Sequence, residues 1–394
     1  MSGAIVDDSG ILTNPHPIYA AWRAEGPVRR VRLPSGEQVW MVTGYQVARA
    51  ALTDGRLSKA PRDPDSYSDA DNAINRHMLS SDPPDHTRLR RLVAAAFTTR
   101  RVEELRPRIE RIADTLLDEM RGSDRVDLIS AYAFPLPLQV ICLLLGVPVR
   151  ERDTFRAWST TIASGIDATG GATGEDLRTT VAEPTAYLRN LVAHRHDHPG
   201  DDLLSALVSA RDDEDRLSGD ELTSMAFLLL VAGHETTMSL IGNGTYLLLR
   251  DRRRWDRLRA DRTLLPAAIE EFLRYESPVE LSTGRVATED FTLGGQRIEA
   301  GDIVMVNLLA ANRDPAHFES PDELIVDRPR NPHLAFGHGI HHCLGAPLAR
   351  VEALVAFDKL LTAAPDLTLA VDPDELSWRP TTLMRSLRSL PVRI

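Results

Sequence analysis

Apolar residues recur with helical spacing along most of this chain and alternate with polar residues in only a few short stretches. The helical pattern, with its period of about 3.6 residues, covers residues 84–97, 102–120, 136–145, 175–195, 218–249, 264–276 and 346–364. Alternation typical of short strands occurs in residues 28–33 and 38–43, on either side of a PSGE turn, and in residues 284–307. The pattern predicts a mainly α protein with a minor β part.

The polar breaks between these segments are too short and too mixed in composition for interdomain linkers, and the sequence has no internal repeat. With 394 residues, of which 43% are hydrophobic, the chain is long enough to bury a large core. We therefore expect residues 1–394 to form a single domain.

The composition narrows the classes of function and location. The net charge of −11 disfavours a nucleic-acid-binding protein, which needs a basic surface. The N-terminal residues lack a cationic stretch followed by an apolar one, so we expect neither a signal peptide nor a membrane anchor. Two widely spaced cysteines, Cys142 and Cys343, argue against a disulfide framework and suit a reducing compartment. These features favour a cytoplasmic protein.

The segment 218–249 is the most informative predicted helix. Ser218 and Glu221 have the spacing of a capping box, which fixes the start of the helix. The residues that follow are apolar on nearly all sides, so the helix either lies at the centre of a large protein or spans a membrane. A membrane span would have to bury His234 and Glu235 near its middle, at about 2.5–3.5 kcal/mol for a residue like Asp. We therefore expect a buried central helix and no membrane association.

A polar insert, Gly233-His234-Glu235-Thr236-Thr237, interrupts this apolar helix. Glycine destabilises a helix interior by about 1 kcal/mol relative to alanine, and threonine hydroxyls can bond back to the preceding turn. One interpretation is a kinked core helix whose polar groups satisfy one another. The other is a functional site, because an acid beside an alcohol on a buried helix can move protons across a pocket.

Two other pairs of polar residues are ambiguous on their own. Glu271 and Arg274 are three residues apart on a predicted helix and can pair, as many solvated ion pairs do. His86 and Arg90 are four residues apart, so both can reach one anion from a single helical face. Each pair alone is explained more simply by a solvated polar face.

Cys343 lies in the sequence FGHGIHHCLG, and a strong helical pattern begins at Ala346. A cysteine just before a helix N-terminus meets free backbone amides and the positive end of the helix dipole, which favour its thiolate form. A structural zinc site needs four ligands, but the sequence offers no second cluster at zinc-site spacing. A nucleophilic cysteine stays open at this point, because glycines and histidines also suit that role.

A haem accounts for these features together. A cysteine thiolate is a strong axial ligand that favours O–O cleavage on the opposite face of the haem. The two propionates of a porphyrin need cations, which His86 and Arg90 can supply. Oxygen activation needs a proton source, which Glu235 and Thr236 can supply.

Residues 15–394 resemble the soluble bacterial cytochromes P450. FGHGIHHCLG has the family's haem-loop pattern, Phe-Gly-x-Gly-x-His-x-Cys-x-Gly, at every defined position. AGHETT, which begins at Ala232, has its oxygen-activation pattern, and Glu271-x-x-Arg274 has its Glu-x-x-Arg motif. DPPDHTRLRRLV and GRVATED resemble the family's haem-contacting helix and propionate-binding strand. All five motifs occur in the family's order.

The resemblance implies the cytochrome P450 fold, with haem b between a long central helix and the cysteine loop. It implies that Cys343 is the ligand of the iron. The other residues expected near the cofactor are His86, Arg90, Ala232, Gly233, Arg285, Phe336, Gly339, His341 and Gly345. The propionates are expected to bind His86, Arg90, Arg285 and His341. Gly233 is expected to loosen the helix and make room for oxygen and water.

The resemblance also implies a buried structural network and an activity. Glu271, Arg274 and Arg328 are expected to brace the cysteine loop. Thr236 and Glu235 are expected to be catalytic, moving protons while one oxygen atom is inserted by hydroxylation or epoxidation.

The substrate contacts implied by the resemblance lie in residues 73–79, 279–283 and 382–384 and on one stripe of the central helix. They include Met78, Leu79, Leu229, Ala232, Val279, Thr283, Leu383 and Met384. These mostly small or apolar side chains suit a bulky, mostly neutral molecule. The chain is most similar to actinobacterial members that tailor macrolides and other polyketides, so we expect a role in antibiotic biosynthesis; a terpenoid, steroid or peptide substrate stays open.

No flavin or dinucleotide motif is found in the sequence. By resemblance, electrons are expected from a ferredoxin and a ferredoxin reductase that draws on NAD(P)H. Arg88, Arg91, Arg100 and Arg350 are candidates for a basic docking patch. We expect a monomer with a small-molecule substrate. Three alternatives are a peroxygenase of the same fold, a non-catalytic haem-binding protein and a zinc-dependent hydrolase.

Overall fold

The computed structural model describes most of the chain, and the chain groups into two compact units. The described residues are 4–5, 9–34, 36–60, 75–148, 151, 154–155, 157–158, 174–209, 211–212, 215–381 and 383–394. Unit 1 comprises residues 1–57, 105–136 and 236–394. Unit 2 comprises residues 58–104 and 137–235.

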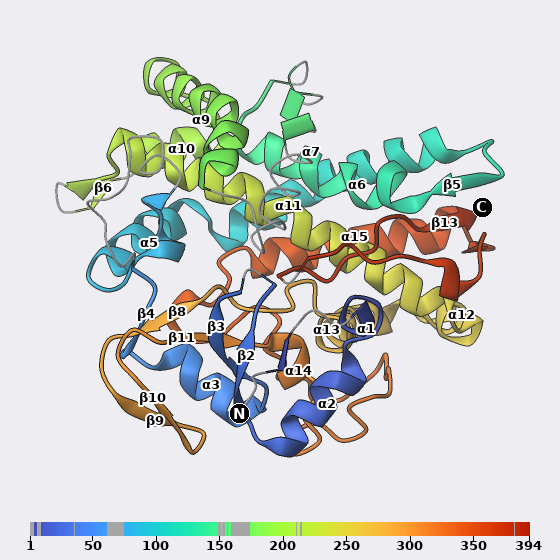
Figure 1. Ribbon diagram of the computed structural model, residues 1–394. Helices are drawn as coiled ribbons and strands as arrows, with labels where there is room; N and C mark the ends of the chain where they lie inside the picture. The colour runs from blue at the N-terminus through green and yellow to red at the C-terminus, as the bar shows by residue number, and fades with distance from the viewer. Residues whose placement is uncertain are drawn as a thin grey trace. The chain divides into compact units, whose positions relative to one another are not determined.

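Every segment predicted to be a long helix is helical, which confirms the mainly α prediction (Figure 1). These helices are α5 (Asp85–Ala96), α6 (Thr99–Met120), α7 (Pro135–Leu144), α9 (Gly174–Asp197), α11 (Gly219–Leu249), α13 (Leu265–Tyr275) and α15 (Ala346–Ala363). The sequence pattern does not predict the shorter helices, because they have too few turns for a clear period. The shorter helices are α1 (Ser9–Thr13), α2 (His16–Glu25), α3 (Tyr45–Thr53), α10 (Leu203–Ser209), α12 (Arg252–Ala260) and α14 (Leu308–Ala311).

A six-stranded sheet has the strand order β1-β2-β3-β11-β8-β4. Its strands are β1 (Ala4–Ile5), β2 (Val28–Arg32), β3 (Gln38–Val42), β4 (Leu57–Ser58), β8 (Arg285–Ala287) and β11 (Ile303–Val306). β2 and β3 form the predicted hairpin, and β11 pairs with β3 in parallel, with Val304 opposite Trp40. β9 (Phe291–Leu293) and β10 (Gln296–Ile298) pair around a turn at Gly294-Gly295, inside the segment 284–307 that was expected to form short strands. The predicted strand regions are therefore confirmed.

The remaining strands form small sheets. β12 (Thr368–Leu369), β13 (Pro391–Arg393) and β5 (Arg125–Asp127) form an antiparallel sheet in unit 1. β6 (Arg211–Asp212) and β7 (Asp215–Arg216) form a two-stranded pair in unit 2.

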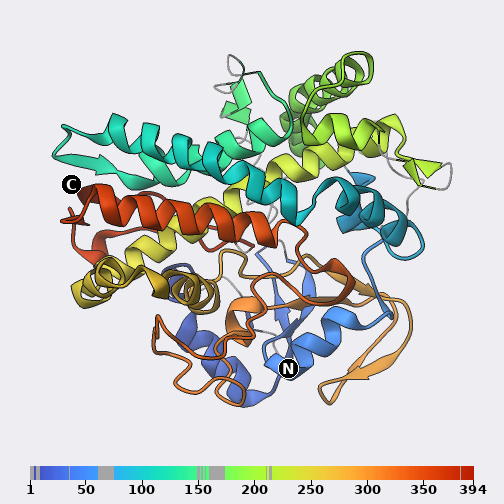
Figure 2. The same ribbon diagram turned by 180° about the vertical axis from the view of Figure 1, so that it is seen from behind.

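In unit 1, α15 lies beside the part of α6 that belongs to the same unit (Figure 2). Lys359 of α15 pairs with Asp114 of α6 at 2.8 Å. The Tyr132 hydroxyl donates a hydrogen bond to the carbonyl oxygen of Ala356, also in α15, at 2.9 Å. These contacts hold the helix that follows the cysteine loop within the helical core of unit 1.

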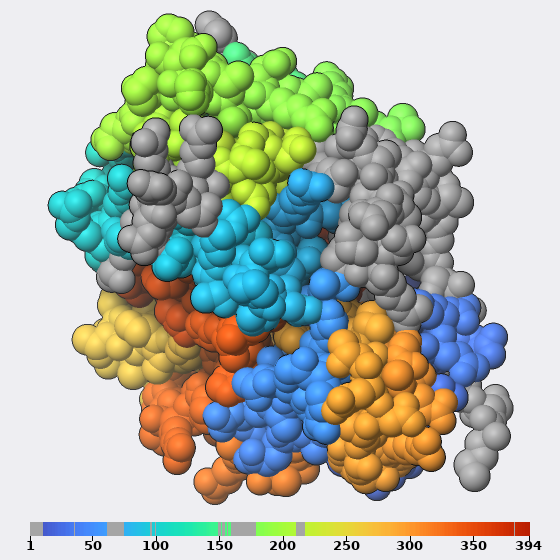
Figure 3. All heavy atoms as spheres, turned by 90° about the vertical axis from the view of Figure 1, so that its left-hand side faces the viewer, coloured from blue at the N-terminus to red at the C-terminus, as the bar shows by residue number. Residues whose placement is uncertain are grey.

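A second part of the core of unit 1 lies where α3 meets the β9–β10 pair. Tyr45 and Ala48 of α3 belong to the same apolar cluster as Phe291 and Leu293 of β9. α3 (blue) and the β9–β10 pair (orange) form neighbouring surfaces in Figure 3.

Unit 2 is built from helices that precede and include the first part of α11. α10 packs against α9 and α5. Phe155 and Tyr187 meet edge to face with ring centroids 5.0 Å apart. Arg195 of α9 pairs with Asp202 at 2.9 Å and donates to the carbonyl oxygen of Gly146 at 2.6 Å.

Helix α11 begins with the predicted capping box. The Ser218 amide donates to Glu221 Oε2 at 2.8 Å, and the Glu221 amide donates to Ser218 Oγ at 3.2 Å. The helix is long and apolar enough to cross a membrane, but 67% of its most apolar window is buried inside the protein, as in the core helix of a soluble protein. It continues without interruption through the polar insert, so the insert does not end the helix.

Candidate active site

The cysteine loop leads directly into α15 and holds an exposed, unbridged Cys343. The Cys343 amide donates to the carbonyl oxygen of Phe336 at 2.8 Å, which closes the loop. Gly337 and Gly339 have φ values of +71° and +75°, a left-handed conformation that glycine adopts readily. The loop therefore depends on glycine for its shape, as its sequence suggests.

Gly339 also lies close to helix α3. A Cβ at this position would lie 2.8 Å from Thr53 Cγ2 and 3.0 Å from the carbonyl oxygen of Leu52. At Gly345, by contrast, a Cβ would lie 3.8 Å from Cys343 Sγ, an ordinary contact distance. Gly339 is therefore needed because the loop packs closely against α3 at this position. The approach of the loop backbone to the sulfur is not the only reason for a glycine here.

One arginine of α15 connects the loop to α13. The Arg350 guanidinium lies 4.6 Å from the centroid of the Phe336 ring and donates to Glu270 at 2.7 and 2.8 Å. These hydrogen bonds, followed by the charges of Glu270 and Cys343, raise the pKa of Arg350. Arg350 therefore connects the ring of Phe336 in the loop to Glu270 of α13.

The histidines around Cys343 have separate surroundings. His333 Nε2 lies 3.0 Å from Glu270 Oε2, and His338 Nε2 lies 3.3 Å from an Arg49 nitrogen. His342 is exposed, and His341 is half-buried at the end of the short 3₁₀ helix η7 (Gly339–His341). Among the described residues, no group of three or more His, Cys, Asp or Glu side chains is placed to hold a metal ion. The separate partners of these histidines give a zinc site no support here.

The donor set of the loop fits a haem. A single exposed thiol before a helix N-terminus would supply one strong ligand to the iron, and the porphyrin would supply its own nitrogen ligands, so no cluster of protein ligands is needed. Two residues of unit 1 are expected to bind the haem propionates. They are Arg285, which lies on β8 and is 5% exposed, and His341.

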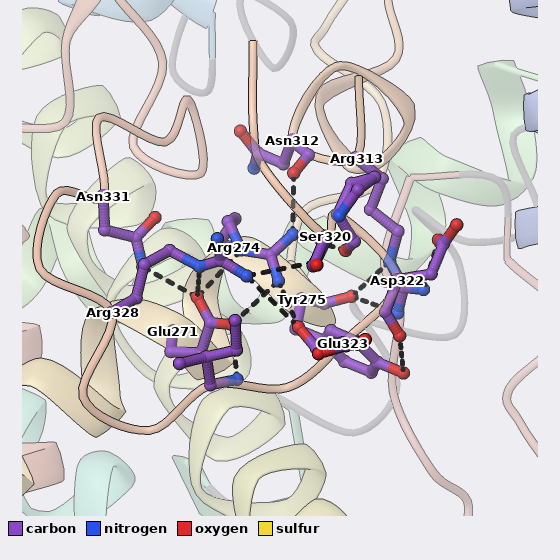
Figure 4. Close-up of polar contacts among 12 residues, drawn as sticks. Glu271, Arg274, Tyr275, Asn312, Arg313, Ser320, Asp322, Glu323, Arg328 and Asn331 are labelled. Carbon is purple, nitrogen blue, oxygen red and sulfur yellow. Dashed lines mark hydrogen bonds and ion pairs between the residues drawn. The ribbon is translucent and has the colours of Figure 1, made fainter. Parts of the chain in front are cut away.

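A buried ionic network lies between α13 and the segment that precedes the cysteine loop (Figure 4). Glu271 and Arg274 pair as predicted, at 2.8 Å, but both are 0% exposed, so this is not a solvated ion pair. Arg328 Nε donates to Glu271 Oε2 at 2.9 Å, as expected for the third member of the network. The Asn331 side-chain amide and the Ile325 backbone amide also donate to this carboxylate, at 3.0 and 2.8 Å.

Both arginines also bind backbone carbonyl groups. Arg274 donates to the carbonyl oxygens of Asn312, Pro321 and Glu323 at 2.7–3.1 Å. Arg328 donates to that of Glu319 at 2.7 Å. Since Asn312 Oδ1 in turn accepts from the amide of Leu334 at 2.6 Å, the network fixes the chain just before the loop.

One stripe of α11 differs in burial from the rest of the helix. Leu229 and Thr236 are half-buried and Ala232 is exposed, whereas most of the other side chains of this helix are buried. These three residues are spaced at i, i+3 and i+7, so they lie on one face. This is the stripe expected to face substrate and cofactor.

The polar insert of α11 has partners that the sequence does not reveal. His234 is 1% exposed; its Nδ1 lies 2.6 Å from the carbonyl oxygen of Leu230, and its Nε2 lies 3.5 Å from Glu235 Oε1. A Cβ on Gly233 would lie 2.9 Å from Ile141 Cδ1 of α7. The helix is continuous at Gly233, and the absence of a side chain there leaves room for this isoleucine; the expected loosening stays a prediction.

Helix α5 carries the two unit 2 residues expected to bind propionates. His86 is 2% exposed and Arg90 is half-buried, one turn further along the same face. Arg88 points to a different partner, since it pairs with Glu221 of the α11 capping box.

The arginines considered for a docking patch have nearby carboxylates. Arg88 pairs with Glu221, Arg350 with Glu270, and Arg100 lies 3.8 Å from Glu104. These pairs reduce the positive charge that the three residues offer to a partner.

The expected substrate contacts occur in several segments. Met78 and Leu79 are half-buried in the 3₁₀ helix η2 (Met78–Ser80) of unit 2. In unit 1, Val279 pairs with Met384 in an antiparallel bridge beside Leu383, whereas Thr283 is exposed. Residues 73–74 and 382 lie outside the described residues.

Several residues of these networks could not be predicted from the sequence patterns. Glu270, Asn312 and Asn331 contact the loop or its bracing arginines, and His234 contacts Glu235. Only Glu270 carried a usable signal, since it is four residues before Arg274 and precedes the Glu-x-x-Arg motif directly. The asparagines lie in irregular segments that no periodic pattern marks.

Comparison with known proteins gives matches over nearly the whole chain. The cytochrome P450 family matches residues 13–154 and 171–364. The cytochrome P450 monooxygenase PikC of Streptomyces venezuelae is 48% identical and covers 99% of this chain and 93% of its own. The vitamin D(3) 25-hydroxylase of Pseudonocardia autotrophica is 46% identical, with coverages of 96% and 93%.

A solved structure, the Bacillus subtilis 168 bacillaene polyketide synthase cytochrome P450 PksS, has the same fold. It superposes with a TM-score of 0.92 at 40% identity and covers 98% of both chains. With the thiolate donor at the start of α15 and the motifs in order, these matches establish that the chain belongs to the cytochrome P450 family of haem-thiolate monooxygenases.

Proposed function

We propose that this chain hydroxylates or epoxidises a bulky, mostly apolar polyketide or macrolide as a step in the biosynthesis of a secondary metabolite such as an antibiotic. The observation that carries the reaction is the exposed, unbridged Cys343 at the start of α15. Residues 1–394 act as a single cytoplasmic domain and as a monomer in this proposal.

The residues that hold the cofactor are assigned from their chemistry and from the family motifs. Cys343 Sγ ligates the iron, and Phe336, Gly339 and Gly345 shape the loop around it. Arg285 and His341 in unit 1, and His86 and Arg90 in unit 2, bind propionate oxygens. When bound, the thiolate-ligated haem supplies the oxygen-atom insertion, with O₂ as the oxygen source and two electrons from a partner.

Thr236 and Glu235 supply protons in this proposal. The Thr236 hydroxyl holds the proton nearest the reacting atoms at its Oγ1, and the Glu235 carboxyl passes protons to it from solvent. His234 Nε2 lies 3.5 Å from Glu235 Oε1, beside that carboxyl.

The role of Thr236 predicts uncoupling. Thr236→Ala should raise the hydrogen peroxide formed per NAD(P)H consumed, while haem content stays the same. Thr245→Ala is a matched control, because Thr245 is a buried threonine of the same helix that donates to the carbonyl oxygen of Ile241 at 2.8 Å. Equal coupling in the Thr236 variant and the wild type would remove Thr236 from the mechanism.

The substrate class is supported by the chain's relatives and by its own residues. A relative is described as a vitamin D(3) 25-hydroxylase and a structural neighbour as a polyketide synthase cytochrome P450, and both descriptions imply a bulky, mostly apolar substrate. Val279, Leu383 and Met384 in unit 1, with Leu229 and Ala232 on α11, are proposed to contact it. Spectral titration with a macrolactone and with vitamin D(3) distinguishes the two classes.

Electrons come from a separate protein, as they generally do in bacterial relatives of this kind. We assign a ferredoxin and a ferredoxin reductase that draws on NAD(P)H as these partners. A peroxygenase would instead turn over with hydrogen peroxide alone, and a non-catalytic haem-binding protein would not turn over with either source.

The experiment that tests the haem-thiolate site is the carbon monoxide difference spectrum of the reduced holoprotein. The wild type should give the red-shifted Soret band of a thiolate-ligated haem, and Cys343→Ala should lose it. Cys142→Ala is the control, because Cys142 is the buried second cysteine, in α7. An unchanged band in Cys343→Ala would contradict the proposed ligand.

A further inference from the structure

Two segments proposed to contact the substrate are held together in unit 1 by backbone hydrogen bonds. Val279 and Met384 form an antiparallel bridge. On either side of it, the Glu280 amide donates to the carbonyl oxygen of Leu383 at 2.8 Å, and the Arg385 amide donates to that of Pro278 at 2.9 Å. The position of Val279 relative to Met384 is therefore fixed by the residues that follow each of them.

Arg385 directly follows Met384 and is 4% exposed, and each of its three guanidinium nitrogens donates a hydrogen bond. Its Nε donates to Glu276 Oε1 at 2.8 Å. Its two terminal nitrogens donate to the carbonyl oxygens of Leu12 and Thr13 at 2.7 and 2.9 Å. A guanidinium fork bound at three points has only one orientation.

Glu276, the partner of Arg385, is bound from further directions. It is 5% exposed, and its Oε2 lies 3.1 Å from His16 Nε2 and 3.8 Å from an Arg313 nitrogen. Burial alone raises its pKa, but contact with His16 and the charges of Arg385 and Arg313 lower it well below its ordinary value. Glu276 therefore stays charged and keeps Arg385 in place.

Glu280, which directly follows Val279, is the second anchored residue. It is 5% exposed, and the Tyr19 hydroxyl of α2 donates to its Oε1. Its backbone carbonyl oxygen accepts from the Leu308 amide at 2.8 Å. Each substrate-contact residue of the bridge is thus followed by a buried polar residue tied to other parts of unit 1.

We propose that Arg385, with Glu276 and Glu280, is a positioning unit that sets where Val279 and Met384 meet the substrate, and so helps to determine which atom is oxidised. None of the three is a catalytic residue. The inference rests on the proposed function, because the contact of Val279 and Met384 with substrate belongs to that proposal. A displacement of about 1 Å in such a contact can change a rate by about a hundredfold.

The test compares two azole ligands of the haem in the holoprotein, imidazole and a phenyl-substituted imidazole, by the shift of the Soret band. Imidazole has nothing beyond the ring that would ligate the iron, whereas the phenyl group would occupy the space proposed for the substrate, which Val279 and Met384 are proposed to contact. Arg385→Lys keeps the charge but loses the fork. We expect it to weaken binding of the phenyl ligand by about tenfold, which corresponds to about 1.4 kcal/mol, and to leave the imidazole affinity and the haem content unchanged.

Arg195→Lys is the matched control, because Arg195 also binds a carboxylate and a backbone carbonyl, those of Asp202 and Gly146, but lies in unit 2. It should leave the ratio of the two affinities unchanged. If Arg385→Lys does not take up haem, Tyr19→Phe replaces it in the test. This substitution removes only the hydroxyl that donates to Glu280. It should change the ratio of the two azole affinities in the same direction, by a smaller factor.

An equal change in both affinities, or no change in either, in a variant that keeps its haem would overturn the positioning role. The absence of the thiolate carbon monoxide band in the wild type would instead contradict the proposed haem site, so the two failures are distinct. With a turned-over substrate, an altered ratio of oxidation products in Arg385→Lys would support the same conclusion.

Discussion

Two glutamates buried in unit 1 show how differently one side chain can be accommodated. Glu271 is 0% exposed and accepts hydrogen bonds from Arg274, Arg328, Asn331 and the Ile325 amide. Glu352, in the middle of α15, is 1% exposed, and none of the described residues donates to its Oε2.

The two carboxyl groups consequently differ in charge. Burial alone raises the pKa of Glu271, but the hydrogen bonds and charge of Arg274, with those of Arg328, more than reverse this and lower the pKa below its ordinary value. Burial raises the pKa of Glu352 well above its ordinary value of 4.5, with no opposing group. Burial therefore does not decide ionisation; the donors within reach decide it.

The largest expected effect is that of Glu271→Gln. The substitution keeps the shape of the side chain but leaves Arg274 and Arg328 buried without their counter-charge. We expect the free energy of unfolding to fall by about 3–5 kcal/mol, as when one partner of a buried pair is removed. Urea unfolding of the holoprotein at neutral pH measures this change.

Asp327→Asn is the control for Glu271→Gln. Asp327 pairs with Arg257, but their side chains are 41% and 49% exposed. An exposed pair contributes about 0–1 kcal/mol, so this variant should unfold at nearly the wild-type urea concentration. Similar losses in the two variants would mean that burial of the Glu271 network has no energetic consequence.

Glu352→Gln is expected to act in the opposite direction. The folded protein keeps the Glu352 carboxyl protonated, whereas the unfolded chain ionises it above its ordinary pKa of 4.5. The wild type therefore loses about 1.4 kcal/mol per pH unit as the pH rises from this value toward the raised pKa, and the glutamine variant does not. Urea unfolding at about pH 5, 6.5 and 8 should show a growing advantage of the variant. A variant that is less stable at every pH would indicate a charged, partnered Glu352.

Glu280→Gln should give the smallest of the three changes. Burial raises the pKa of Glu280 to about 7, opposed by the charge of Arg385 and the hydrogen bond from Tyr19. Because the pKa of Glu280 is raised in the folded protein, the protonated carboxyl contributes fully to the stability of the wild type below about pH 4.5. This contribution is lost as the pH rises to about 7. The gain of the variant should thus level off above neutral pH, at no more than about 3.5 kcal/mol. A gain that keeps growing to pH 9, measured by the same unfolding series, would disagree with this pKa.

Much of the architecture follows from local sequence patterns. The long helices, the hairpin of β2 and β3, and the capping box of Ser218 and Glu221 could be predicted because each depends on residues close together in the chain. The pair of Glu271 and Arg274 was predictable for the same reason, and Arg328 followed from the resemblance to the family.

The burial of that pair and the network around Arg385 could not be predicted in this way. Tyr19 and Glu280 are 261 residues apart, and Arg385 reaches Leu12 across 373. Glu352 lies in a segment of strong helical pattern, and nothing in that pattern shows that its polar position is enclosed on all sides. These features depend on long-range packing, which periodicity does not encode.

The contact of Arg385 with the carbonyl groups of Leu12 and Thr13 has a consequence for recombining this chain with its relatives. Consider a chimera that takes residues 378–394 from another family member and keeps residues 9–25 of this chain. Its two sides of this hydrogen-bonded contact then come from different proteins and did not evolve together. Crossovers that exchange both segments together keep this unit intact. The two segments should therefore be inherited as one block in a shuffled library, despite the distance between them in the gene.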